Sequence, residues 1–391
     1  MEPQNSSSSS HRALQNLLAA LALLTCFSAI FYVYYKPTET ANWQKCPAIP
    51  QHAVCRDICI SALQKPNQIH IINNTCTVNL TSISSHFTQT STAKTPDTVI
   101  LIWTWPFGAK FDLDSCSSMF DIHDCHLTDN RSYFEKADGV FFHHRDIYED
   151  LSNVPNQPRP RLQKWVWMNM ESPSNSPRYP SLNDLFNLTS SYRLDSDISV
   201  PYGRLIRGKT NGIIPKKTKL VCWIVSNWNS AYKRSQYYEE LKEHITIDVY
   251  GNAFHKRISS EDYTSVVSSC RFYLSFENSI HKDYITEKLF NPLILGTVPV
   301  VLGPPRRNYE ELIPAGAFIH IEDFSTPEGL AQHLKLLEKN EDLYMQYFSW
   351  REDLVASESR FGLEHACRAC DHIRRNQNYR VVNELNGWYW G

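Results

Sequence analysis

The sequence lacks a strong charge bias. Its 391 residues contain 39 Lys and Arg against 41 Asp and Glu, which gives a formal net charge of −2 at pH 7. A protein that binds nucleic acid needs a basic surface to displace counterions from the phosphates, and no cluster of basic residues in this sequence supplies one. Nucleic acid is therefore not an expected partner.

Two other signatures are missing. The sequence has no G-x-G-x-x-G, the glycine fingerprint of dinucleotide-binding folds, so we expect neither an NAD-type nor an ATP-type phosphate loop. No His or Cys pair of zinc-finger spacing follows Cys55 and Cys59. Disulfides therefore explain these two cysteines better than a zinc site does.

No charged residue occurs between Ala13 and Tyr35. A helix of this length matches a hydrocarbon core of roughly 30 Å, so we predict a transmembrane signal anchor at 13–35 behind a cytoplasmic tail at 1–12. A cleaved signal peptide is the alternative, but no small-x-small cleavage site follows the apolar run. His11 and Arg12 precede the run, which favours a cytoplasmic amino terminus.

Glycan acceptor sequons follow the apolar run and indicate a carboxy-terminal bulk in the secretory pathway. Their asparagines are Asn73, Asn79, Asn130 and Asn187. Ten of the eleven cysteines lie outside the apolar run, an even number that suits pairing in an oxidising lumen. Residues 36–97 include a Ser/Thr-rich stretch with few core-forming residues, and we read them as a stem.

Runs of apolar residues then read as strands, and they are apolar almost throughout, as strands covered on both faces are. They span 98–103, 139–144, 164–170, 219–227, 245–251, 271–278, 298–303 and 317–321. Helical patterns at 230–244 and 326–340 alternate with the later runs. We predict an α/β protein with two Rossmann-like doubly wound domains, 98–205 and 219–365, that face a cleft and are joined by a linker at 206–218.

Cationic residues follow two of these strands, where ligands bind in such sheets. Arg234 lies in the first turn of one predicted helix, after Asn229-Ser230 as a cap, and Lys288 lies shortly inside another, after Asp283 as a cap. Helix starts and cations favour a diphosphate. Glu287 would repel phosphate, so we expect it to accept hydrogen bonds from sugar hydroxyls.

A carboxylate follows a strand of the other predicted domain. Glu171 comes directly after WVWMNM and before prolines, at the rim of the expected cleft. Partial exclusion from water by Trp165, Trp167 and Met168 favours a general base. The alternative role for Glu171 is a loop cap.

Two D-x-D patterns offer a competing chemistry, because such pairs hold a divalent metal on the diphosphate in some nucleotide-sugar enzymes. They are Asp112-Leu113-Asp114 and Asp195-Ser196-Asp197. Cationic helix starts can neutralise the same leaving group. We therefore expect no required metal and no metal site, and at most a stimulation of turnover by a divalent metal.

Longer motifs identify a resemblance. FENSIHKDYITEKLFNPLILGTVPVVLGPPRRNYEELIP, with WTWPFG, FFHHRD, WMNMESPSNSP, YRLDSDISVPYG and CRAC, closely resembles the vertebrate α1,3-fucosyltransferases of the Lewis-antigen type from about Thr98 to the carboxy terminus. The resemblance implies a single-pass type II Golgi membrane enzyme of GT-B fold with a lumenal catalytic domain. It also implies inverting transfer of L-fucose from GDP-β-L-fucose to O3 of GlcNAc in Gal-β1,4-GlcNAc (LacNAc) on glycoproteins or glycolipids.

The family's site residues transfer position by position. Glu171 matches the general base, and Lys288 and Glu287 match contacts to the diphosphate and the ribose. The implied donor-binding residues are Tyr202, Ser226, Asn227, Arg234, Tyr273, Asn278, Tyr284, Glu287 and Lys288. Glu171, His144 and Arg145 are the expected acceptor contacts. Arg145 stands where relatives that also make α1,4 bonds carry tryptophan, which favours O3 of type 2 chains. The alternative is that Arg145 only pairs with Asp146 or with a neighbouring surface carboxylate.

The resemblance also implies disulfides. Cys222 matches a partner of Cys270, and the pair Cys367 and Cys370 folds back onto Cys116 and Cys125, which places residues 366–391 against the first domain. Ala109 stands where some relatives have an acceptor-binding glutamine. A membrane-anchored glycan-binding protein without turnover is the alternative function, and any homodimer would form through the stem or the membrane span.

Overall fold

The computed structural model describes residues 70–72, 75–77, 97–209 and 213–391. Residues 93–391 form one compact unit. Before it, β1 (His70–Ile72) and β2 (Thr75–Thr77) pair antiparallel. The predicted membrane span, the sequons at Asn73 and Asn79 and three stem cysteines lie outside the described residues. No helix among the described residues is long and apolar enough to cross a membrane.

The first sheet of the compact unit is parallel, with strand order β4-β3-β5-β6-β7-β8. Its strands are β3 (Thr98–Ile102), β4 (Cys125–Thr128), β5 (Gly139–His143), β6 (Lys164–Asn169), β7 (Leu188–Ser191) and β8 (Ile198–Ser199). The sequence predicted β3, β5 and β6. It missed β4, β7 and β8, which are short and partly polar.

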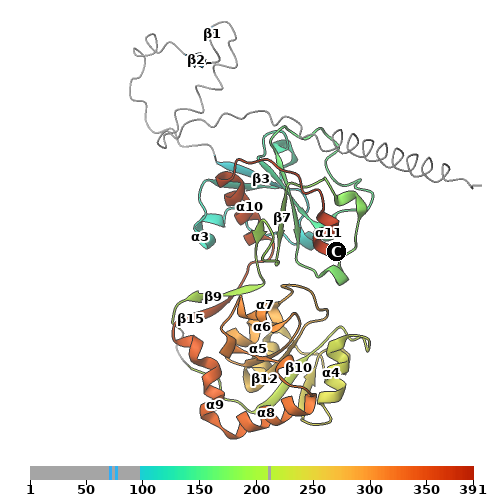
Figure 1. Ribbon diagram of the computed structural model, residues 1–391, viewed down its shortest axis with the longest axis vertical. Coiled ribbons are helices and arrows are strands. Elements are labelled where there is room, and N and C mark those ends of the chain that lie inside the picture. The colour runs from blue at the N-terminus through green and yellow to red at the C-terminus, as the bar shows by residue number, and fades with distance from the viewer. Residues whose placement is uncertain (1–69, 73–74, 78–96, 210–212) are drawn as a thin grey trace, which may run out of the picture. The chain divides into compact units, whose positions relative to one another are not determined.

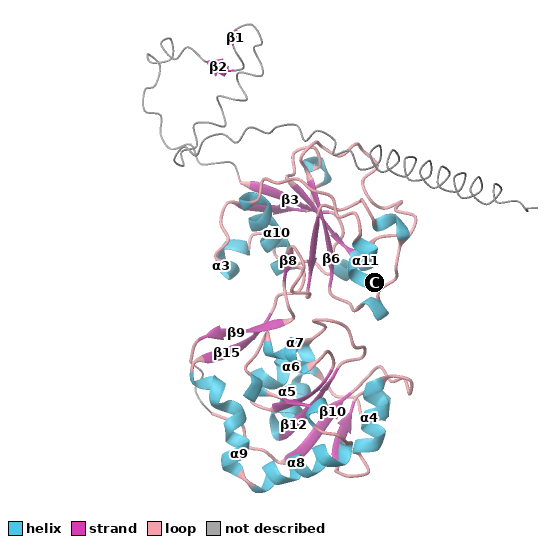
Figure 2. Ribbon diagram, viewed as in Figure 1, coloured by secondary structure: helices cyan, strands magenta, loops and turns pink. Residues whose placement is uncertain are grey.

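The second sheet is also parallel, with order β11-β10-β12-β13-β14. Its strands are β10 (Lys219–Ile224), β11 (Ile247–Tyr250), β12 (Cys270–Phe276), β13 (Val298–Leu302) and β14 (Ile319–His320), and all five were predicted. The main helices around it are α4 (Lys233–Leu241), α5 (Ser260–Ser269), α6 (Glu287–Ile294), α7 (Arg306–Glu310), α8 (Pro327–Lys339) and α9 (Glu341–Met345). Figure 2 shows these helices around the strands of this sheet.

The chain returns to the first sheet near its end. β15 (Leu354–Glu358) pairs antiparallel with β9 (Gly203–Arg207), so the two crossings between the sheets lie side by side. Helix α10 (Leu363–Arg375), red in Figure 1, then packs on β3, β4 and β5. Disulfides Cys116–Cys367 and Cys125–Cys370 fix it there through α3 (Cys116–Phe120) and β4. The chain ends in α11 (Leu385–Trp390).

The disulfide expectations are confirmed. Cys222 and Cys270 are bonded between β10 and β12, and the other two bonds supply the individual partners, which the sequence left open. The Cys222–Cys270 bond lies in a small buried cluster on the second sheet, in which Val267 and Tyr273 pack with the two cysteines.

The expectation that the sequence contains no ATP-type phosphate-loop pattern is wrong as far as its letters go, because such a pattern overlaps the predicted linker. Residues 203–210 read GRLIRGKT and match the letters G-x-x-x-x-G-K-T. A phosphate loop must connect a parallel strand to a helix, whereas Gly203–Arg207 is the antiparallel strand β9. In addition, a side chain at Gly203 would meet the Phe290 ring at 2.4 Å. The match is therefore not a phosphate site.

Two described sequons differ in environment. Asn130 is exposed, and it remains a predicted glycan site. Asn187 is 1% exposed, its Nδ2 donates to the Arg380 carbonyl at 2.6 Å, and its Oδ1 accepts from the Trp165 N–H at 2.8 Å. Because Nδ2 is the atom that carries an N-glycan, the structure argues against the glycan predicted at Asn187.

Candidate active site

Three charged side chains meet at the start of α6. Thr286 caps the helix by accepting from the Lys288 N–H, so Glu287 and Lys288 occupy the first turn, as predicted. Lys288 Nζ lies 2.9 Å from Glu287 Oε1 and 3.4 Å from Glu277 Oε2. Burial acts to lower the pKa of Lys288, but these two carboxylates outweigh burial and raise it. A permanently charged ammonium at a helix amino terminus suits an anion.

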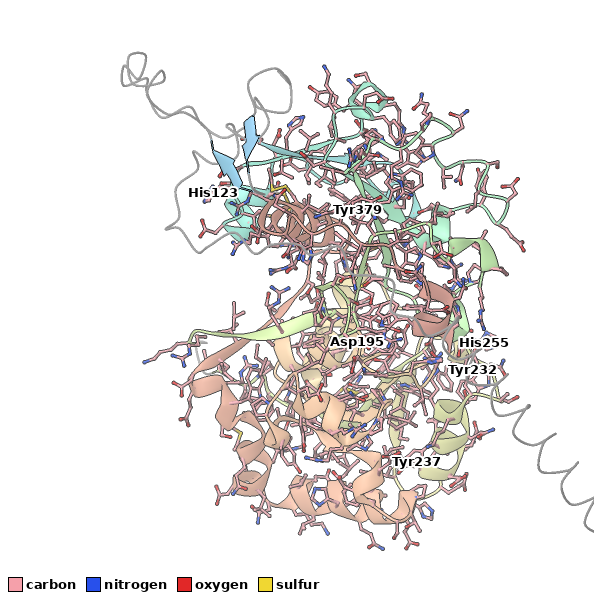
Figure 3. The ribbon with its side chains drawn as sticks, turned by 45° about the horizontal axis from the view of Figure 1, so that its top comes forward. His123, Asp195, Tyr232, Tyr237, His255 and Tyr379 are labelled. Atoms are coloured by element: carbon pink, nitrogen blue, oxygen red, sulfur yellow. A yellow bond between two sulfur atoms is a disulfide. The ribbon has the colours of Figure 1, made fainter. Side chains whose placement is uncertain are left out.

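Arg234 supplies a second cation at the start of α4. Its side chain is 5% exposed and donates to the Asn227 carbonyl, and its Nε has no hydrogen-bond partner within the described part of the chain. Burial lowers the pKa of Arg234 and the charge of Glu277 opposes this effect. Because Lys288 also pairs with Glu277, the two cations lie around the same carboxylate. Tyr232, labelled in Figure 3, is the N-cap residue of α4.

The expected helix caps are wrong in both helices. Asn229 Oδ1 accepts from the Ala231 N–H in the turn before α4. Asp283 accepts from the Leu194 N–H at 3.1 Å and from Asn308 Nδ2 at 2.7 Å. Asp283 therefore joins the loop after β7 to the second sheet and does not cap α6.

A cavity of about 670 Å³ lies beyond the carboxyl ends of β10 and β11. Its lining includes Ser226, Gly251, Asn252, Arg257, Ser259 and Tyr263. Ser226 was predicted there, whereas Asn252, Arg257 and Tyr263 were missed because no recognised motif contains them. Their position directly after β11 and at α5 was the available signal.

Some predicted donor residues lie below the surface of the site. Tyr273 is 3% exposed and packs with the Cys222–Cys270 disulfide, so its side chain is not accessible for direct contact with a donor. Tyr273 instead packs in the cluster against which the cavity residue Tyr263 lies. Asn278 is partly exposed and follows Glu277 in the loop after β12. Asn227 and Ser226 are both exposed after β10.

Glu171 lies in the loop after β6, as predicted. Its N–H donates to Asn169 Oδ1 at 3.1 Å, and its carbonyl accepts from the Tyr389 hydroxyl. Within the described residues no group donates a hydrogen bond to the Glu171 carboxylate. This carboxylate is therefore free to accept a proton from a ligand.

Two tyrosines connect Glu171 to the charges of the second sheet. The rings of Tyr202 and Tyr284 meet edge to face with centroids 6.3 Å apart. Burial raises the pKa of both hydroxyls, and the charges of Glu277, Glu171 and Glu287 add to the effect on each. Charges that belong to both sheets therefore act on one tyrosine pair.

Direct contacts join the loop after β6, which contains Glu171, to the loop between β12 and α6. Ser172 Oγ lies 2.7 Å from Ser279 Oγ, and Ser174 Oγ lies 2.6 Å from His281 Nε2. The residue after Glu171 thus contacts the loop that leads from β12 to α6. This places the base candidate and the cationic helix start on neighbouring loops.

The structure contradicts the acceptor contact predicted for His144. This side chain has 0% exposure, its Nε2 lies 2.9 Å from the Pro177 carbonyl, and its Nδ1 accepts from Trp167 Nε1 at 3.2 Å. A ring enclosed in this way cannot touch an acceptor. Its neighbour Arg145 is exposed and donates to the Asn175 carbonyl in the loop after Glu171.

The alternative for Arg145, pairing with Asp146 or with a neighbouring surface carboxylate, is not what the structure shows, because none of the ion pairs among the described residues includes Arg145. Asp146 Oδ2 lies 2.6 Å from His143 Nδ1 and accepts from the Phe107 N–H at 2.8 Å. Arg145 is therefore a residue that holds the loop of Glu171, and it leaves part of its guanidinium exposed beside that loop.

Three aspartates of the two D-x-D patterns, Asp112, Asp195 and Asp197, have protein partners for their carboxylates. Asp195, labelled in Figure 3, pairs with Arg193 and Lys282. Asp197 accepts from the Thr189 N–H at 2.9 Å and pairs with Arg380. Asp112 accepts from the Asp114 N–H in an exposed turn. Among the described residues no three His, Cys, Asp or Glu side chains form a group that could hold a metal.

Family models match both halves of the compact unit. Residues 95–203 match "Fucosyltransferase, N-terminal" and residues 214–388 match "Glycosyltransferase family 10 (fucosyltransferase) C-term". A crystal structure of an α1,3-fucosyltransferase with GDP-fucose has the same fold, with a TM-score of 0.50 at 15% identity over 76% of this chain and 96% of that one.

Curated relatives match nearly the whole chain. The mouse 4-galactosyl-N-acetylglucosaminide 3-alpha-L-fucosyltransferase 9 is 46% identical over 386 residues, 98% of this chain and 99% of the relative. A bovine 3-galactosyl-N-acetylglucosaminide 4-alpha-L-fucosyltransferase is 45% identical over 388 residues, 97% of this chain and 96% of the relative. Overall identity therefore does not separate the two linkages.

The hydrogen bond from Tyr389 to the Glu171 carbonyl yields a first prediction. Tyr389→Phe removes one hydroxyl beside the candidate base, so we expect kcat with GDP-fucose to fall about 5- to 30-fold, equivalent to about 1–2 kcal/mol. The KM for the donor should stay constant. Tyr379→Phe, in the same segment but 45% exposed, is the control, and an equal loss in both variants would contradict the assignment.

Burial of His144 yields a pH prediction. Burial lowers the pKa of His144 to about 4, so between pH 6.5 and 4 the unfolded chain binds a proton here that the folded chain does not. The free energy of unfolding should therefore fall as the pH falls through this range, by up to about 3 kcal/mol. His144→Gln retains a donor and an acceptor without titrating.

Thermal unfolding at pH 6.5, 5.5 and 4.5 checks this prediction. The decrease in Tm should be smaller in His144→Gln than in the wild type, whereas His244→Gln, at an exposed position, should follow the wild type. Parallel Tm curves for all three proteins would show that His144 does not titrate as described.

Proposed function

Because the chain belongs to glycosyltransferase family 10, the fucosyltransferases, we propose that it transfers L-fucose from GDP-β-L-fucose to O3 of GlcNAc in Gal-β1,4-GlcNAc, giving Lewis x-type glycans. The observation that carries this proposal is the contact between the Glu171 loop and the loop that leads to Lys288. It joins a free carboxylate to a cationic site, which inverting transfer requires.

GDP-fucose is the proposed donor. Its diphosphate would lie at Lys288 and Arg234. The Lys288 ammonium is charged, and the buried Arg234 Nε, which has no hydrogen-bond partner among the described residues, can donate to an anion. The nucleoside would extend toward the 670 Å³ cavity that contains Ser226. Glu287, with a side chain 48% exposed, remains available to the ribose hydroxyls.

Glu171 is the proposed general base. In a single displacement the acceptor O3 attacks C1 of fucose, its proton passes to the Glu171 carboxylate, and the bond from C1 to the diphosphate oxygen breaks with its electron pair leaving on GDP. Lys288 and Arg234 stabilise the charge that develops on this leaving group. The proposed reaction requires no metal ion.

Type 2 chains are the proposed acceptors. The mouse relative is named for action at O3 of a 4-galactosylated GlcNAc and the bovine relative for action at O4 of a 3-galactosylated one. Arg145, held beside the Glu171 loop, supports the first of these, because its charged guanidinium cannot orient the disaccharide as an apolar indole would.

We also propose a Golgi location with a type II orientation. The uncharged run from Ala13 to Tyr35 and the exposed sequon at Asn130 support it. Fluorescence of the full chain with a carboxy-terminal tag in permeabilised and intact cells tests both the compartment and the side of the membrane.

An acceptor panel tests the reaction. With GDP-fucose we expect purified protein to fucosylate Gal-β1,4-GlcNAc at O3 and to act at least about tenfold less on Gal-β1,3-GlcNAc, because the acceptor must present O3 to Glu171. Chelation of divalent metals should leave part of the rate. Efficient transfer to O4 of the type 1 disaccharide would contradict the linkage, and a rate restored only by manganese would contradict metal independence.

A further inference from the structure

A buried carboxylate outside the predicted site set lies under Lys288. Glu277 directly follows β12, is 2% exposed, and belongs to the FENS motif without an expected role. A buried charge is costly unless it is paired and hydrogen-bonded. The groups that pair with Glu277 therefore indicate which role of this buried carboxylate offsets the cost of its burial.

Among the described residues, the hydrogen-bond and ion-pair partners of the Glu277 carboxylate all lie at the start of α6. Glu277 Oε1 accepts from the Thr286 N–H at 2.8 Å and from Thr286 Oγ1 at 2.9 Å, and Oε2 lies 3.4 Å from Lys288 Nζ. Thr286 Oγ1 in turn lies 3.0 Å from Lys288 Nζ and accepts from the Lys288 N–H. Glu277 and Thr286 thus hold both the backbone and the ammonium of Lys288.

The neighbouring strand leaves room for this carboxylate. Gly303 follows β13, and a Cβ at this position would lie 2.3 Å from the Tyr309 hydroxyl and 3.3 Å from Glu277 Cγ. Glycine at 303 therefore keeps Glu277 and Tyr309 in place beneath the helix start.

From these contacts we propose that Glu277, acting through Thr286, is a positioning residue that orders the Lys288 ammonium for the donor diphosphate. The inference rests on the proposed donor site. A lysine on a flexible four-carbon stem loses rotamer freedom when it binds phosphate. Lys288 is already fixed before the donor arrives, so the loss on binding is smaller.

The opposite effect of Glu277 must be weighed, because a carboxylate near a diphosphate also repels it. Here Lys288 pairs with the negative charge of Glu277, and Thr286 donates hydrogen bonds to this carboxylate. The same charge also interacts favourably with Arg234, where it opposes the lowering of the pKa by burial. Positioning therefore predicts weaker donor binding when the charge of Glu277 is removed, whereas simple repulsion predicts tighter binding.

Two isosteric variants of the full chain separate these effects. Glu277→Gln should raise the KM for GDP-fucose at least about tenfold and leave the KM for the acceptor unchanged. Thr286→Val, which replaces the hydroxyl with a methyl group, should act in the same direction, and Thr286→Ser, which keeps the hydroxyl, should have a donor KM near that of the wild type. Glu364→Gln is the matched control, because Glu364 is also 2% exposed and ion-paired, but with Arg204 and Arg368.

Each outcome either supports or overturns the positioning role of Glu277. Donor KM raised in Glu277→Gln and Thr286→Val but not in Thr286→Ser or Glu364→Gln supports the inference. A donor KM that is unchanged or lowered in Glu277→Gln overturns it, as does an equal rise in Glu364→Gln. If Glu277→Gln does not fold, the Thr286 pair alone decides. If the wild-type protein shows no transfer, the proposed function itself fails, which is a distinct result.

Discussion

The site depends on the contact between two loops at strand ends, one after β6 and one after β12. Ser172, next to Glu171, meets Ser279, two residues after Glu277. In parallel sheets side chains that do chemistry lie beyond the carboxyl ends of strands, and each sheet here supplies one half: a free carboxylate after β6, and cations at the starts of α4 and α6. Neither half alone could remove a proton and stabilise a leaving group in one step.

The return of the chain to the first sheet supports this arrangement. After β15 the chain crosses beside β9, and α10 is fixed by disulfides to α3 and β4. The final helix then reaches the base loop, where Trp390 Nε1 donates to the Ser176 carbonyl at 3.1 Å. Sequence-distant residues thus hold the loop of Glu171 in place, which explains why the carboxy-terminal segment packs on the first sheet.

The sequence predicted the long apolar strands and the charged first turn of α6, because burial on both faces and helical spacing leave a strong local pattern. It missed β7 and β8, which contain Thr and Ser and gain their place only through pairing. The resemblance to the family led to the assignment of His144 to the acceptor, although only tertiary packing decides that this ring is enclosed. Glu277 was missed for the same reason, since its partner Thr286 lies nine residues away.

In the proposed reaction, Glu171 is the base that faces a preformed donor site. Glu171→Gln keeps the size of the side chain and removes its ability to accept the proton. We expect transfer of fucose to the disaccharide to fall about 100- to 10,000-fold, while the Kd for GDP, measured by calorimetry on the same protein, changes less than about twofold. Transfer that stays within tenfold of the wild type with GDP binding intact would show that Glu171 is not the base.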